Sequence, residues 1–189
     1  MLLQTFKNFL IIIFLLVFTL ACNQSEESAI RNSSSLQREN IKKKDHNKFT
    51  IDGLGNVKIG SKFTDNQELK KHTDVLDGCF EAKSNLHKNV SYMVQDDIVT
   101  NIGISESNVA SPYGVKVGDY KIQVDNKHKG EKPEIVNNPY GEPGVNIVIY
   151  YWYSVGGKVL GIRYDVDNDI VTSISIGLKD SLLLMEGCA

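Results

Sequence analysis

One thirteen-residue stretch occurs twice in this chain and constrains its fold more than any other feature. Residues 92–104 read YMVQDDIVTNIGI and residues 164–176 read YDVDNDIVTSISI, so eight of the thirteen positions are identical. In each copy a Tyr-x-Val segment precedes an acidic turn, and an Ile-Val-Thr-x-Ile-x-Ile segment follows it. Alternating apolar residues on both sides of a turn are typical of two paired strands. We therefore expect each copy to form a β-hairpin.

Side chains alternate along a strand, which predicts what each hairpin buries. If the first turn takes residues 95–97, one face carries Tyr92, Val94, Ile98, Thr100, Ile102 and Ile104, and the other carries Val99, Asn101 and Gly103. The second copy sorts into Tyr164, Val166, Ile170, Thr172, Ile174 and Ile176 against Val171, Ser173 and Ser175. The apolar face must be covered, most simply by helices, and the small polar face is expected to be open to a partner.

The hairpins divide the folded part of the chain into two modules, which we place at residues 49–107 and 112–189. In the first module, Thr64 and Gln67 have the spacing of a capping box, so a short helix is expected near them. A Val-Lys-Val-Gly segment at 115–118 repeats the Val-Lys-Ile-Gly segment at 57–60, and again a helix-length polar segment follows. We predict an α+β fold of two tandem helix-plus-antiparallel-sheet modules, with helices covering one face of the sheet.

The N-terminal region predicts export from the cytoplasm. An uncharged apolar run follows Lys7, so residues 1–21 are expected to be a signal peptide. The run ends in Thr19-Leu20-Ala21-Cys22, which resembles the lipobox of bacterial lipoproteins and implies a lipid anchor on Cys22. The alternative is cleavage by the ordinary signal peptidase, which would give a soluble exported protein. Asn23 in place of an aspartate favours the outer membrane, and the polar residues 22–48 are expected to form a disordered tether.

The three cysteines fit this interpretation. Lipidation of Cys22 leaves Cys79 and Cys188, an even pair in an oxidising compartment. We expect these two cysteines to form a structural disulfide. Such a bond would close a long loop and join the first module to the C-terminal end of the chain.

The most apolar strand expected after the signal peptide is at residues 145–154, VNIVIYYWYS. Alternation places Val148, Tyr150 and Trp152 on the face that carries Ser173 and Ser175 in the neighbouring hairpin. Aromatic side chains beside small residues would form a raised patch, and Tyr and Trp are enriched at binding hot spots. We therefore identify these five residues as the candidate partner-binding surface, with a place in the core as the alternative.

The sequence offers no catalytic or metal-binding pattern. The motifs GxSxG, HExxH and SxxK are absent, and the four histidines have no ligand spacing. Asp165, Asp167 and Asp169 begin like a calcium loop, but Ile170 and Ile176 stand where the loop needs glycine and glutamate. A net charge of −2 without a basic stripe argues against nucleic acid. No catalytic residue, metal or cofactor is expected.

Several segments carry a resemblance to known families. The two glycine-ended strands, each followed by a short helix and a hairpin, resemble the tandem modules of the β-lactamase inhibitor protein. They also resemble the single module of the small lipoprotein of the outer-membrane β-barrel assembly machine. The part of the chain with Met93-Val94, residues 113–119, Pro139-Tyr140 and residues 185–188 is similar to a family of uncharacterised proteobacterial envelope lipoproteins. The resemblance implies an α+β fold and an exported location, and it carries no activity.

These observations lead to three hypotheses of different classes. The first is a non-enzymatic envelope lipoprotein, anchored in the outer membrane and facing the periplasm, that binds a protein partner through its open sheet face. The second is a periplasmic binding protein for a small ligand or cell-wall fragment, with Trp152 stacking on a ring. The third, an envelope hydrolase, is disfavoured because no catalytic motif is present.

Overall fold

The computed structural model describes residues 49–188. The predicted signal peptide, the lipidation site Cys22 and the predicted tether lie outside the described residues. The strands are β1 (Phe49–Thr50), β2 (Gly53–Leu54), β3 (Val57–Lys58), β4 (Leu69–Lys71), β5 (Cys79–Ser84), β6 (Val90–Gln95), β7 (Ile98–Ile104), β8 (Glu134–Asn137), β9 (Asn146–Val155), β10 (Lys158–Asp167) and β11 (Ile170–Leu178). The helices are η1 (Phe63–Asp65, a 3-10 helix), α3 (Lys121–Lys127) and α4 (Lys179–Leu182).

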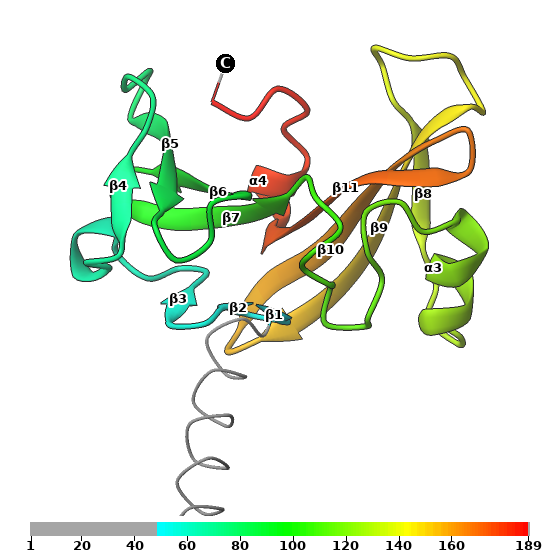
Figure 1. Ribbon diagram of the computed structural model, residues 1–189, viewed down its shortest axis with the longest axis horizontal. Helices are drawn as coiled ribbons and strands as arrows, with labels where there is room; N and C mark the ends of the chain where they lie inside the picture. The colour runs from blue at the N-terminus through cyan, green and yellow to red at the C-terminus, as the bar shows by residue number, and fades with distance from the viewer. Residues whose placement is uncertain (1–48, 189) are drawn as a thin grey trace, which may run out of the picture. The chain divides into compact units, whose positions relative to one another are not determined.

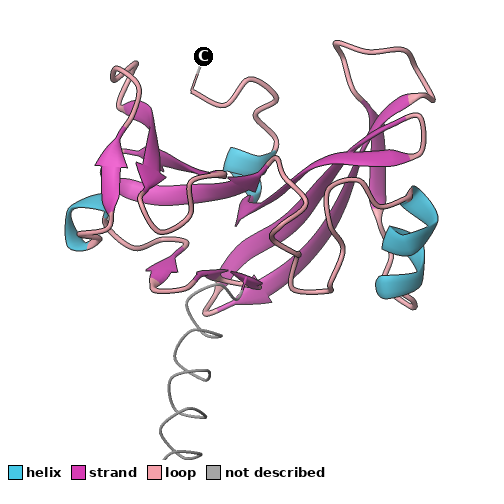
Figure 2. Cartoon of the chain, in the orientation of Figure 1, coloured by secondary structure: helices cyan, strands magenta, loops and turns pink. Residues whose placement is uncertain are grey.

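The strands form two antiparallel sheets (Figures 1 and 2). A small sheet has the order β1-β2-β3, and a large sheet has the order β4-β5-β6-β7-β11-β10-β9-β8. Each half of the large sheet is therefore a four-stranded meander that ends in one of the predicted hairpins, β6–β7 or β10–β11. Both hairpins are confirmed, and their last strands join the two halves into one continuous sheet.

The junction between β7 and β11 has an internal symmetry. Gly103 pairs with Ser175, and these two residues hold the same position in the two repeats. On either side of them, Ile104 pairs with Ile174 and Ile102 pairs with Ile176. This reciprocal pairing is the pattern of a two-fold axis. The duplicated units are thus related by a pseudo-two-fold axis that passes beside Gly103 and Ser175.

The predicted sorting of side chains in the hairpins is wrong near the turns. The turns have two central residues, Asp96-Asp97 and Asn168-Asp169, all with positive φ. Positive φ at both central residues is typical of the type I′ turn, whose twist suits a hairpin. Both ladders also shift register, between Met93 and Val94 and at the equivalent place in the second copy, which indicates a β-bulge.

The bulge exchanges the faces of the residues beside it. Val99 and Val171, expected on the polar face, are fully buried in the main core. Thr100 and Thr172, expected among the isoleucines, instead donate a hydrogen bond from Oγ1 to the carbonyls of Met93 and Asp165. Ile170, expected to be buried, is 39% exposed. Beyond the bulge the predicted alternation holds, because Ile102, Ile104, Ile174 and Ile176 all lie in the core.

The apolar face of the large sheet is not covered by helices, and the predicted α+β fold class is wrong. Within residues 49–188 the structure has only two short α-helices, and the fold is mostly β. The covering side chains come from β1–β3 and irregular chain, with α3 contributing one buried residue, Val124. The helix predicted near Thr64 is a single 3-10 turn followed by β4. The segments at residues 61–73 and 119–131, where helices were expected, are too short and too polar to form long amphipathic helices. Small strands and loops cover the core instead.

The opposite face of the large sheet, which we call the outer face, is not open either. Helix α4 lies on it, followed by residues 183–188, the C-terminal strap (Figure 1). The guanidinium of Arg163 on β10 donates hydrogen bonds to the carbonyls of Leu182 and Leu184, at 3.2 and 3.3 Å. The predicted disulfide between Cys79 and Cys188 is present and ties the far end of the strap to β5.

Candidate binding cavity

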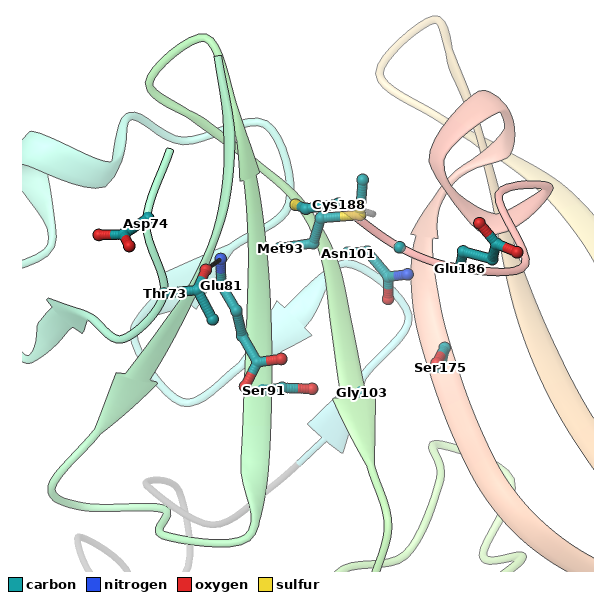
Figure 3. Close-up of a pocket in the computed structure, with 11 residues that line it drawn as sticks. Thr73, Asp74, Glu81, Ser91, Met93, Asn101, Gly103, Ser175, Glu186 and Cys188 are labelled. Carbon is teal, nitrogen blue, oxygen red and sulfur yellow. Dashed lines mark hydrogen bonds between the residues drawn. The ribbon is translucent and has the colours of Figure 1, made fainter. Parts of the chain in front are cut away.

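A cavity of about 350 Å³ lies on the outer face beside the strap (Figure 3). Its floor comes from β6, β7 and β11, one wall from β5 and the loop after β4, and the other wall from the strap. The lining residues are Thr73, Asp74, Glu81, Ser91, Met93, Asn101, Gly103, Ser175, Glu186, Gly187 and Cys188. Since Gly103 and Ser175 mark the pseudo-two-fold axis, the cavity lies at the junction of the two repeats.

The cavity exists because the floor residues are small. Ser91, Gly103 and Ser175 are paired across three adjacent strands and form one row of the sheet. A Cβ atom on Gly103 would lie 2.9 Å from Oγ of Ser91, so even alanine would crowd this row. The alternation in the repeat predicted this face for Gly103 and Ser175, whereas Ser91 precedes the repeat and was not assigned to a face.

Covalent and hydrogen bonds hold the two walls. On one side, Oγ1 of Thr73 accepts a hydrogen bond of 2.9 Å from the backbone N–H of Glu81, which joins the loop after β4 to β5. On the other side, the disulfide fixes Cys188, and the hydroxyl of Tyr140 donates a hydrogen bond to the carboxylate of Glu186. Bonds within the chain itself therefore hold both walls of the cavity.

The lining is acidic. Asp74, Glu81 and Glu186 are among the lining residues, and no Lys, Arg or His is. The Asp74 carboxylate points away from the cavity floor (Figure 3), and that of Glu186 accepts the hydrogen bond from Tyr140. Lys83 forms an ion pair of 2.7 Å with Glu81, so the charge of that carboxylate is partly compensated. Asp74 and Glu186 form no ion pair within residues 49–188.

Polar atoms on the floor lack partners. Oδ1 of Asn101 is buried and accepts no hydrogen bond from another described residue. The hydroxyls of Ser91 and Ser175 likewise have no partner in the described part of the chain. A buried acceptor without a donor is unfavourable by about 1 to 3 kcal/mol. Oδ1 of Asn101 has less than 1 Å² of accessible surface, so the two serine hydroxyls are the floor groups that a bound molecule can reach directly.

The structure separates the five residues of the predicted partner-binding surface. Val148 and Tyr150 are fully buried and form a second small core with Leu182 of α4. They do lie on the predicted face of β9, but α4 covers them, so their side chains do not offer an open surface. Of the two serines, Ser175 lies in the cavity floor and Ser173 donates a hydrogen bond to the carboxylate of Asp165.

Trp152 is half-buried and contacts residues of β8, β9, β10 and α4. Its ring stacks on that of Tyr150 at 5.0 Å, its Nε1–H donates to Glu134 at 2.7 Å, and Nζ of Lys179 lies 5.3 Å from the ring centroid. The ring also lies on Gly161, where a Cβ atom would approach it to 2.4 Å. Trp152 is thus part of the packing between β9, β10 and α4, and it does not line the cavity.

One polar network was missed by sequence reasoning. His128 lies between the rings of Tyr113 and Tyr151, with centroids 3.9 and 3.8 Å away. Its Nε2 is 2.8 Å from the hydroxyl of Tyr164, and its Nδ1 is 3.1 Å from the carboxylate of Glu131. Burial lowers the pKa of His128, against the opposing effect of Glu131. No sequence spacing could have shown this network, because it joins residues from separate segments.

The His128 network resembles a catalytic relay only in its residue types. The hydroxyl of Tyr164 is also 3.2 Å from Oγ of Ser111, so a chain of hydrogen bonds runs from Ser111 to Glu131. Ser111, His128 and Tyr164 are all buried and none of them lines the cavity. The network therefore links the loop before α3, the loop after it and β10 on the core side of the sheet.

Residues 49–188 contain neither a metal-binding cluster nor a membrane-spanning helix. Among them, no group of three or more His, Cys, Asp or Glu residues is arranged to hold a metal ion. In the same range, no helix has the length and hydrophobicity needed to cross a membrane.

Comparison with known proteins adds little. No protein-family model and no curated protein matches the chain. A solved structure of an extracellular protein containing an SCP domain from Bacillus anthracis str. Ames is similar with a TM-score of 0.40 and 13% identity. The match covers 66% of this chain and 45% of that chain, so it spans less than half of that protein. At this TM-score the similarity supports no argument, and the resemblance to envelope lipoproteins stays a prediction.

Proposed function

We propose that this protein is a non-enzymatic binding protein of the bacterial cell envelope, and that its ligand occupies the cavity on the outer face. One observation carries the proposal: a cavity at the repeat junction is lined by the hydroxyls of Ser91 and Ser175, which have no hydrogen-bond partner within residues 49–188, beside Asn101, whose buried Oδ1 has none either. Cavities that bind ligands are largely preformed and contain a few well-placed polar groups. The ligand is either a small molecule or one side chain of a partner protein.

The envelope location is supported by two features of the chain. The N-terminal apolar run and the lipobox-like segment at Cys22 favour an exported, lipid-anchored protein, in the outer membrane and facing the periplasm. The disulfide between Cys79 and Cys188 also suits an oxidising compartment, because disulfides are rare in the cytosol.

The composition of the cavity supports binding rather than catalysis. Its cysteine is engaged in the disulfide, and its two serines have no hydrogen-bonded base, which a nucleophile requires. The first hypothesis, a protein docked on Val148, Tyr150 and Trp152, has less support because two of these side chains are buried.

Photo-crosslinking in intact cells tests this proposal. A photoreactive residue replacing Asp74, at the rim of the cavity and outside its floor, is expected to form an adduct of defined mass in the full chain. The same residue at Ile122, which is 61% exposed on α3, is the matched control and should not form that adduct. Adding Ser91→Met, which fills the cavity, should abolish the adduct. An adduct that forms equally from both positions, or that survives Ser91→Met, would contradict the proposal.

A further inference from the structure

We propose that the disulfide between Cys79 and Cys188 is a redox switch for the cavity. Reduction by a dithiol protein of the cell envelope breaks this bond and releases residues 185–188, which we call the strap end, while α4 stays in place. The inference rests on the proposed function, because residues of the strap end form one wall of the same cavity (Figure 3). It adds the event that opens that wall.

Helix α4 and the first residues of the strap are held by contacts that do not involve the disulfide. Leu182 is fully buried in the second small core. Oγ of Ser181 lies 3.1 Å from Oγ1 of Thr100 on β7. Arg163 donates hydrogen bonds to the carbonyls of Leu182 and Leu184. This part of the chain therefore keeps its place on the outer face when the disulfide is broken.

The strap end has far fewer contacts. Within the part of the chain that the structure describes, none of residues 185–188 takes part in a backbone–backbone hydrogen bond. Met185 packs at the edge of the second small core, and Glu186 accepts its hydrogen bond from Tyr140, which is itself 69% exposed. Glu186 and Gly187 are exposed. The covalent bond to Cys79 is thus the main constraint on the position of the strap end.

The boundary between the held and the released part lies between Leu184 and Met185. The carbonyl of Leu184 is the last one that Arg163 holds, and the next firmly fixed atom along the chain is Sγ of Cys188. A segment of four residues reaches up to about 13 Å from its attachment point. Release at Cys188 therefore lets the whole strap end leave the cavity wall.

The two sulfur atoms differ in their access to a reductant. Cys79 is only 6% exposed, whereas Cys188 is partly exposed and lines the cavity. A thiolate of the dithiol protein attacks Sγ of Cys188 and forms a mixed disulfide there, and Sγ of Cys79 leaves as a thiolate that takes up a proton. The second thiol of the reductant then displaces Cys188 from the mixed disulfide. Two electrons and two protons pass to the two cysteines, and the dithiol becomes a disulfide.

A trapping experiment tests this chemistry. A thioredoxin-type protein whose second active-site cysteine is replaced by serine cannot complete the second step, so it stays attached to the sulfur that it attacks. We incubate it with the detergent-solubilised, oxidised full chain, quench with acid and locate the adduct by mass spectrometry. The adduct is expected on Cys188, whereas the urea-unfolded chain, as the control, should form adducts on both cysteines. An adduct on Cys79 of the folded chain, or none on it, would contradict the inference.

NMR and fluorescence test whether the release is local. On reduction of the full chain, the backbone order parameters of Glu186 and Gly187 should fall from about 0.85 to below about 0.6, the value of a flexible segment. Those of Leu182 and Leu184 should not change. Trp152 is the single tryptophan of the chain and contacts α4 through Lys179, so its emission maximum should also stay unchanged. Unchanged order in the strap end, or a shift of the Trp152 emission, would overturn the inference.

Arg163→Lys tests the position of the boundary. Lysine keeps the positive charge beside Asp165, but one ammonium group cannot replace the fork that donates to Asp165 and to two carbonyls. After reduction, the release should extend into α4 in this variant and shift the Trp152 emission to longer wavelength. Tyr140→Phe, the control, removes only the hydrogen bond to Glu186 and should behave like the wild type. The same emission in reduced Arg163→Lys and reduced wild type would show that Arg163 does not set the boundary.

The crosslinker at Asp74 tests whether the switch controls the ligand. Cys79→Ser combined with Cys188→Ser should abolish the adduct in intact cells, because the strap end no longer closes the cavity, while the Trp152 emission shows that the domain is folded. An undiminished adduct in this double variant would overturn the inference and leave the proposed function standing. If no adduct forms even with the disulfide intact, the proposed function fails, and the NMR measurement alone decides whether reduction releases the strap end.

Discussion

Tyr92 and Tyr164 occupy the same position in the two repeats, but their hydroxyl groups differ in surroundings. Both side chains are fully buried, and burial raises the pKa of both. The hydroxyl of Tyr164 contacts His128 and Ser111, whereas that of Tyr92 has no hydrogen-bond partner among the described residues. Equivalent residues can therefore contribute differently to stability.

This difference gives a matched pair of substitutions. Tyr164→Phe should lower the free energy of unfolding by about 1 to 3 kcal/mol, because it leaves Nε2 of His128 without a partner in a buried site and removes one of the hydrogen bonds of Ser111. Tyr92→Phe removes a hydroxyl that has no partner, so its effect should stay within about 0.5 kcal/mol. Urea unfolding of both variants measures the difference, and equal losses would contradict the role of the network.

The lowered pKa of His128 predicts how stability depends on pH. In the folded state the neutral imidazole is favoured by burial, whereas in the unfolded state His titrates near its ordinary value of about 6.5. Stability from this group is therefore complete above that value and is lost as the pH falls through the lower folded pKa. The contribution is up to about 1.4 kcal/mol per pH unit within this window.

His128→Gln tests the assignment of this pH dependence. We expect the variant to be less stable than the wild type at pH 7.5, with a flatter decline toward pH 5. His72→Gln is the control, because His72 is exposed and the wild-type slope should persist in that variant. The slope is obtained from urea unfolding at several pH values. If His72→Gln flattened it as much as His128→Gln, the assignment to His128 would be wrong.

At the scale of elements, the two hairpin turns share a backbone geometry but not their side-chain contacts. Asp97 and Asp169 have φ values of 65° and 63°, where glycine is favoured. The carboxylate of Asp97 also accepts hydrogen bonds from the N–H and hydroxyl of Thr64, which fastens η1 to the first hairpin. No such contact involves the Asp169 side chain within the described residues.

Asp169→Gly should therefore stabilise the protein by about 0.5 to 1 kcal/mol, because it creates the Asn-Gly pair that type I′ turns prefer. Asp97→Gly relieves the same backbone strain but removes the two hydrogen bonds to Thr64, so no gain is expected from it. Thermal unfolding of the two variants side by side measures the contrast. A gain in both would show that the contacts of Thr64 do not contribute.

The elements that could be predicted from sequence are those with local signals. The period-two alternation predicted the two hairpins and the two faces of β9, and the count of cysteines predicted the disulfide. The bulge beside Thr100 has no comparable signal, and it reversed the faces of the residues around it. Helices were predicted where short strands and loops cover the core. An apolar sheet face requires a covering layer, but it does not determine the secondary structure of that layer.

Most of the candidate site could not be predicted, because its residues come together through contacts between segments that are distant in the sequence. The repeat placed Gly103 and Ser175 on a small polar face, which correctly locates the cavity floor. Asp74 and Glu186 lie far apart in the sequence and reach the cavity only through the loop after β4 and the strap. The burial of Tyr150 likewise depends on α4, whose position is set by contacts such as those of Arg163 with Leu182 and Leu184.

At the scale of the whole molecule, the disulfide closes the strap over both repeats. Residues 79 and 188 are separated by 109 positions, and cross-linking a loop of this length stabilises a fold by up to about 4 to 5 kcal/mol in the chain-entropy model. Replacing both cysteines by serine should lower the free energy of unfolding by about 2 to 5 kcal/mol and weaken binding in the cavity, whose wall contains Cys188. The double variant should not respond to a reductant, whereas the wild type should lose stability in it.

The proposed location at the membrane depends on Cys22, which lies outside the described residues. Because Cys79 and Cys188 form a pair, Cys22→Ser leaves no unpaired cysteine and should not disturb the fold of residues 49–188. If Cys22 is acylated, the wild type should incorporate labelled palmitate and sediment with membranes, since acyl chains anchor through about 0.8 kcal/mol per buried CH₂ group. Cys22→Ser should then lose the label and leave the membrane fraction, while its disulfide and unfolding midpoint stay unchanged. A wild-type protein that is already soluble and unlabelled would instead support cleavage by the ordinary signal peptidase.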